Sequence, residues 1–140
     1  MKTILVAVDG SEPSLKGVRT AVELAKAMGL GLELVYVLKP ILLPPTAYAE
    51  AIQRVEEGNR LLAEDALKAA VKVVTDLGST CETTMLHGAP AEAIADLADE
   101  PRVWGVVIGA KGHNAVSRVM LGSVADRLVH VCKKPVLVVR

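Results

Sequence analysis

The sequence predicts an α/β fold: a single doubly wound, five-stranded parallel sheet of the Rossmann-like type, with helices on both faces. Five short apolar runs alternate with longer segments of helical periodicity, which is the pattern of consecutive strand–helix units. The first, fourth and fifth runs are almost continuously apolar, as is typical of strands covered on both faces. A length of 140 residues fits one domain, which we expect to span residues 1–140.

The predicted strands span residues 3–8, 32–38, 80–86, 103–108 and 135–139. The third run is half polar, and a position at the edge of the sheet would explain that polarity. Because crossovers between parallel strands are right-handed, few arrangements of five strands remain. We expect the strand order 3-2-1-4-5, which is the commonest of them.

The first and third connections carry clear signals for helices. Ser11 is a candidate N-cap of the first helix, Pro13 suits its first turn, and Gly29 ends it. After the third strand, a turn ending at Pro90 starts a short helix that runs to about Ala98. Both helices therefore have the length of ordinary crossover helices.

The second and last connections differ in length. Residues 47–77 form a long helical pattern that ends at Gly78, and Gly58 within it marks either a kink or a division into two helices. A loop of residues 109–122 follows the fourth strand, and a final helix runs from Ser123 to about Val131. The predicted elements thus account for nearly the whole chain.

The strand order locates the expected ligand site. In the order 3-2-1-4-5 the chain reverses direction between the first and fourth strands, and ligands bind at the carboxyl ends of strands that flank such a switch point. Here these ends are followed by Asp9, Gly10 and Ser11, and by the loop after Ile108.

That loop contains a spaced glycine motif, G-x2-G-x9-G-[ST], made by Gly109, Gly112, Gly122 and Ser123. Glycines let the backbone approach a ligand closely, and the N-terminus of a following helix attracts phosphate groups. Taken singly, each residue has a structural alternative, in which Gly109 ends the strand, Gly112 makes a turn and Ser123 caps the helix. Taken together at the switch point, they predict a phosphate-binding loop.

The whole chain resembles the universal stress proteins. The resemblance rests on the glycine loop and on four stretches, which run from Ile4 to Ser11, from Val35 to Val37, from Gly88 to Ala91 and from Lys134 to Arg140. It implies a Rossmann-like fold, and the glycine motif is similar to that of the ATP-binding branch of the family. The implied ligands are ATP and Mg²⁺.

The resemblance also implies roles for single residues. Asp9 would face the ribose and phosphates and help to hold Mg²⁺, although taken by itself it is as well explained by an Asx-turn or a helix cap. Val37 would line the adenine pocket, unless it is simply a core residue. The other implied site residues are Ala7 and Val8 near the adenine, Ile108 and Gly109 beside the sugar, and Lys111, Gly112, Gly122, Ser123 and Val124 around the phosphates.

The amino-acid composition disfavours nucleic acids and membranes as partners. Sixteen basic and sixteen acidic residues and only three aromatic ones disfavour a nucleic-acid reader. No apolar stretch approaches the length of a membrane span, and two cysteines make no disulfide framework. We therefore expect a cytoplasmic protein without a nucleic-acid or membrane partner.

The last strand suggests self-association. It runs from Pro135 to Arg140 and is expected at an edge of the sheet, where an apolar unpaired strand is a hazard that proteins cover or pair. Pairing with the same strand of a second copy around a two-fold axis would satisfy it, and the family is similar in forming dimers in this way. We expect a homodimer.

Three functional hypotheses remain. The first is an ATP-binding stress-response switch or regulator that changes conformation or partner affinity. The second is an enzyme of the same fold that hydrolyses nucleotides or transfers adenylyl groups, but the sequence has no nucleophile elbow, Walker A motif or paired catalytic acids, so any ATP hydrolysis should be slow. The third is a phosphoreceiver or flavin domain, which is disfavoured because Asp9 has no acidic neighbour and aromatic residues are scarce.

Overall fold

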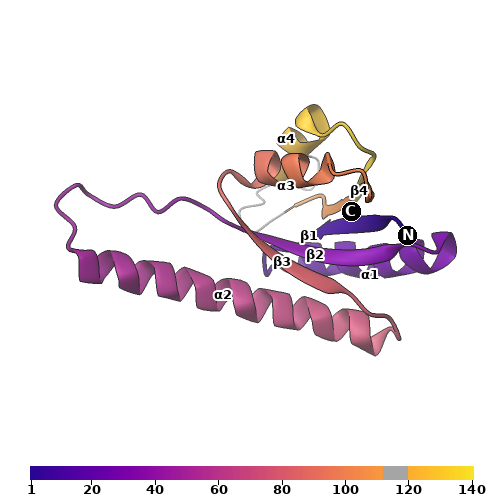
Figure 1. The fold of residues 1–140 in the computed structure, drawn as a ribbon, viewed down its shortest axis with the longest axis horizontal. Coiled ribbons are helices and arrows are strands. Elements are labelled where there is room, and N and C mark those ends of the chain that lie inside the picture. The colour runs from indigo at the N-terminus through magenta and orange to yellow at the C-terminus, as the bar shows by residue number, and fades with distance from the viewer. Residues whose placement is uncertain (112–119) are drawn as a thin grey trace.

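The computed structural model describes residues 1–111 and 120–140. Strands and helices alternate through these residues (Figure 1). The elements are β1 (Thr3–Ala7), α1 (Glu12–Met28), β2 (Gly31–Leu38), α2 (Ala49–Asp76), β3 (Glu82–His87), α3 (Pro90–Ala98), β4 (Val103–Gly109), α4 (Ser123–Val131) and β5 (Val136–Val139).

The strands form one parallel sheet in the order β3-β2-β1-β4-β5. This confirms the predicted fold class and strand order. The half-polar third strand lies at an edge, as its composition indicates. Helices α1 and α2 cover one face of the sheet and α3 and α4 cover the other (Figure 1).

Two apolar cores lie on the two faces of the sheet. Neighbouring side chains of a strand point to opposite faces, so Ile4 and Val6 pack into the core under α1 and α2, and Leu5 packs into the core under α3 and α4. All three side chains are fully buried. This two-sided burial explains why the first run is continuously apolar.

Helix α1 begins and ends as the sequence indicates. The Ser11 hydroxyl accepts a hydrogen bond from the amide of Ser14, at 3.3 Å, and caps the first turn. At the other end Gly29 has a φ of 69° and donates its N–H to the carbonyl of Ala25. A left-handed cap of this kind suits glycine because it has no Cβ.

Helix α2 is one continuous helix, so Gly58 does not divide it into two. Only its second half packs on the sheet, through the buried residues Ala63, Ala66, Leu67, Ala70 and Val74. The first half projects beyond the sheet together with the preceding loop (Figure 1). No helix in the described part of the chain is both long and apolar enough to cross a membrane.

One charged residue lies inside the sheet. Glu33 of β2 is only 3% exposed, and its carboxylate accepts hydrogen bonds from both terminal nitrogens of Arg102, at 3.0 and 3.3 Å. Arg102 also pairs with Glu100. Two parallel bonds from a guanidinium satisfy a buried carboxylate, so this ion pair ties β2 to the start of β4.

Candidate functional site

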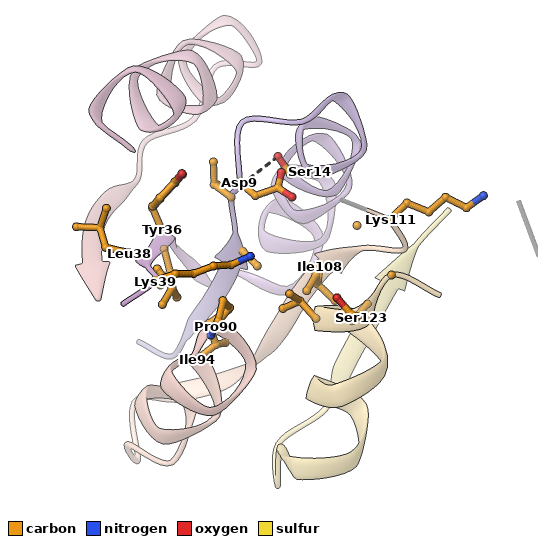
Figure 2. A pocket seen from close by; sticks show the side chains of 18 of the residues that line it. Asp9, Ser14, Tyr36, Leu38, Lys39, Pro90, Ile94, Ile108, Lys111 and Ser123 are labelled. Carbon is orange, nitrogen blue, oxygen red and sulfur yellow. Dashed lines mark hydrogen bonds between the residues drawn. The ribbon is translucent and has the colours of Figure 1, made fainter. Parts of the chain in front are cut away.

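A cavity of about 380 Å³ opens at the carboxyl ends of β1, β2 and β4. It lies at the switch point of the sheet, where the strand order leads a ligand site to be expected. Figure 2 shows side chains from these strands, from α1, α3 and α4 and from the loop after β2 around it. Its lining includes the sequence-predicted residues Ala7, Val8, Asp9, Val37, Ile108, Gly109, Lys111, Gly122, Ser123 and Val124. The remaining predicted residue, Gly112, lies outside the described residues.

Asp9 stands at the cavity wall within a turn that joins β1 to α1. Its Oδ1 accepts a hydrogen bond from the amide of Ser11 at 2.9 Å and another from the Ser11 hydroxyl. The first of these closes an Asx-turn, which is the structural alternative for this residue. Asp9 therefore shapes the turn and also lines the cavity.

Close packing of α1 against the end of β4 leaves no room for a side chain at Gly109. A Cβ at this position would lie 2.6 Å from the carbonyl oxygen of Pro13 and 3.2 Å from the amide nitrogen of Ser14, both in the backbone of α1. A Cβ on Gly17 of the same helix would lie 3.3 Å from the amide nitrogen of Gly109. The two glycines let the first turns of α1 approach the end of β4.

The N-terminus of α4 faces the same cavity. Gly122 is the N-cap, with φ −60° and ψ 153°, and Ser123 is the first helical residue. The predicted start of this helix at Ser123 is confirmed, and the structural alternative, in which Ser123 caps the helix, does not hold. Gly122 makes no side-chain cap, and the first-turn amides of a helix have no acceptor within the helix and carry the partial positive charge that attracts anions.

Several lining residues were not predicted from the sequence. Leu38 and Lys39 end β2 and begin the next loop, Pro90 and Ile94 come from α3, and Asn59 and Leu62 come from α2. The others are Ser14, Val35, Tyr36, Pro40 and Ala125. The residues at the end of β2 were within reach of the switch-point argument, whereas those of α2 and α3 reach the cavity only through tertiary packing.

The two lysines at the cavity point in different directions. Figure 2 shows the Lys39 side chain directed from the end of β2 into the space between Asp9 and Pro90. The Lys111 side chain points away from the cavity. Lys111 therefore contributes to the wall of the cavity, while its ammonium group is directed outward.

Tyr36 gives the cavity a neutral phenol. Burial raises the pKa of its hydroxyl above the ordinary value of 10.0, and the negative charge of Asp9 raises it further. The phenol thus remains protonated around neutral pH. It can both donate and accept a hydrogen bond.

A second, more open hollow of about 1240 Å³ adjoins the cavity, between the loop after β2 and the first half of α2. The two share Leu38, Lys39, Pro40 and Asn59. Across the described ranges, no group of three His, Cys, Asp or Glu side chains is arranged to hold a metal ion by itself. Cys81 and Cys132 are free thiols.

Comparison with known proteins identifies the family of the chain. Residues 1–140 match the Universal stress protein family. The chain is 33% identical to a universal stress protein of Methanocaldococcus jannaschii, over 99% of this chain and 82% of the relative. It superposes on the universal stress protein UspA of Lactobacillus plantarum with a TM-score of 0.86, at 27% identity, over 99% of this chain and 97% of that one.

A further similar structure contains a nucleotide. The universal stress protein of Archaeoglobus fulgidus in complex with dAMP matches with a TM-score of 0.74 and 26% identity, over 100% of this chain and 98% of that one. The family match, the curated relative and the shared architecture agree with one another. The chain belongs to the universal stress protein family.

Proposed function

We propose that the switch-point cavity binds an adenine nucleotide, ATP with Mg²⁺, and that the protein acts as a nucleotide-dependent switch or regulator in a stress response. One observation carries this proposal. The predicted nucleotide-binding residues that lie within the described chain all line the same cavity. The chain's membership of the universal stress protein family and the dAMP complex of a relative support the choice of ligand.

The lining suggests how the nucleotide lies. Val37 and Ala7 offer an apolar surface for the adenine, and Asp9 offers a carboxylate that accepts hydrogen bonds from ribose hydroxyls. The phosphates lie toward Gly122 and Ser123, where helix α4 begins. The ligand would thus extend from the end of β2 to the N-terminus of α4.

The donor set fits a magnesium ion that arrives with the nucleotide. Mg²⁺ is usually held by one or two carboxylates together with phosphate oxygens and water. Asp9 supplies one carboxylate at the cavity wall. In the proposed complex Asp9 holds the ion, and the ion neutralises phosphate charge near that carboxylate.

We also propose a cytoplasmic homodimer. Strand β5 lies at an edge of the sheet, and Leu137 in it is 39% exposed. Antiparallel pairing of two β5 strands would satisfy the free backbone groups of that edge. Two free thiols suit a reducing compartment.

The alternative is an enzyme that hydrolyses ATP or transfers its adenylyl group. No pair of acidic side chains lines the cavity, where Asp9 is the only carboxylate among the described residues, so we favour binding over turnover. Sustained release of phosphate or pyrophosphate, measured with candidate acceptors present, would support the enzyme and contradict the switch.

The binding proposal is tested by calorimetric titration of Mg·ATP into nucleotide-stripped protein. We expect saturable binding near one nucleotide per chain, and tighter binding of ATP than of AMP, because three phosphates have more contacts with the helix N-terminus and the glycine loop. A titration without saturable heat, repeated by equilibrium dialysis with the same result, would contradict the proposal.

A further inference from the structure

Lys39 is a cation inside the candidate site that the glycine motif does not include. It follows Leu38, the last residue of β2, and lines the cavity. Its side chain is directed into the cavity, between Asp9 and Pro90 (Figure 2). Of the two lysines in the lining, it is the one whose ammonium group faces the space that a ligand would fill.

No carboxylate in the described part of the chain forms an ion pair with this cation. Within residues 1–111 and 120–140, Lys39 forms no ion pair. The Lys39 side chain is exposed and extends over the cavity. An ammonium group in such a place offers three donors and a full positive charge to an anionic ligand.

The cavity therefore has two anion-attracting features on opposite sides. The loop after β2 brings the Lys39 ammonium from one side of β1, and the loop after β4 brings the N-terminus of α4 from the other. A group between them would meet a point charge on one side and helix amides on the other. A phosphate group is the part of a nucleotide that suits both.

We propose that Lys39 is a specificity-determining residue that binds a phosphate of the nucleotide and so makes the site select nucleotides over nucleosides. This inference rests on the proposed function, since it concerns the same cavity. The charged bond from the Lys39 ammonium to a phosphate oxygen forms only when the ligand is phosphorylated. Adenosine fills the apolar part of the cavity without it.

The test compares AMP with adenosine in the wild type and in Lys39→Met, which keeps the length of the side chain and removes its charge. We expect the Kd for AMP to rise about tenfold, which is the low end for a hydrogen bond to a charged group, because Lys39 is exposed. The Kd for adenosine should stay within about twofold, since no charge is involved. Lys39→Arg should retain most of the affinity for AMP.

Lys72→Met is the matched control. It removes an exposed lysine of α2 that does not line the cavity, and it should leave both affinities unchanged. Equal losses for AMP and adenosine in Lys39→Met, or no loss for either, would overturn the role of Lys39 while nucleotide binding itself stands. A wild type that binds neither ligand would overturn both the proposed function and this inference.

Discussion

Gly109 and Gly122 belong to one motif, yet they are glycine for different reasons. A Cβ at Gly109 would meet the backbone of Pro13 at 2.6 Å, so a side chain there must push α1 away from β4. Gly122 has a φ of −60°, which any residue adopts without strain. Its backbone conformation therefore suits any residue, and in the proposed complex a side chain there would obstruct the approach of phosphate to α4.

We expect Gly109→Val to lower the free energy of unfolding by about 2 kcal/mol or more, as overpacking against backbone does, and Gly122→Val to abolish nucleotide binding with the fold largely intact. Chemical denaturation and nucleotide titration of both variants check this contrast. Undiminished affinity in a folded Gly122→Val protein would place the phosphates elsewhere, and an unchanged denaturation midpoint in Gly109→Val would contradict the packing argument.

Tyr36 offers a prediction on pH. Its pKa is raised above 10.0 by burial and, to a smaller extent, by Asp9. Because folding raises this pKa, the protonated phenol contributes stability below the ordinary value, and that contribution is lost as the pH rises through the raised value.

The difference in near-ultraviolet absorbance between the wild type and Tyr36→Phe, followed over alkaline pH, isolates the titration of this phenol. We expect a midpoint above 10.0. In an Asp9→Asn background the midpoint should fall but remain raised, since burial is the larger cause. A midpoint at the ordinary value would show that the phenol is fully solvated.

The glycine spacing predicted lining residues at the end of β4 and the start of α4, and the family resemblance predicted those at the end of β1. Lys39 directly follows β2 and was within reach of the switch-point argument, but Asn59 and Leu62 carry no such signal. These two reach the cavity only because α2 packs across one face of the sheet and brings its middle over the end of β2. The ion pair between the buried Glu33 and Arg102 was also missed, since the two residues lie 69 positions apart.

At the scale of elements, the sequence predicted every strand and helix of the described chain to within about two residues, as strongly periodic segments allow. The predicted third strand began at residue 80, whereas β3 spans Glu82–His87, because its polar start does not pair with β2. The sequence pattern left open whether Gly58 breaks α2. The helix continues through it, since flanking residues with good helix propensity outweigh one glycine.

Two glycine-to-alanine substitutions test the helix geometry. Gly58 lies inside α2, and no neighbouring atom lies within 4 Å of the position that a Cβ would take there, so Gly58→Ala should raise the free energy of unfolding by about 0.5–1 kcal/mol. Gly29 caps α1 with a φ of 69°, so Gly29→Ala should lower it by about 1 kcal/mol. Denaturant titrations that show the same sign for both variants would contradict these assignments.

At the scale of the whole molecule, β5 forms one edge of the sheet and we propose that it pairs with a second copy. Leu137→Glu should convert the dimer to a monomer, because it places two like charges at a two-fold interface. Leu61→Glu is the control, since Leu61 is 50% exposed in α2, which packs far from that edge. Sedimentation analysis measures the oligomeric state of the wild type and of both variants. A wild type that sediments as a monomer would contradict the proposal.

We propose that one cavity at the switch point holds the nucleotide, and an NMR titration of isotope-labelled protein with Mg·ATP tests this proposal. We expect the largest changes in amide shift at Asp9, Val37, Gly109 and Ser123, which line the cavity from β1, β2, β4 and α4. Amides of β3 and of the second half of α2 should move little. Saturating shifts confined to any surface away from these four residues would contradict the account.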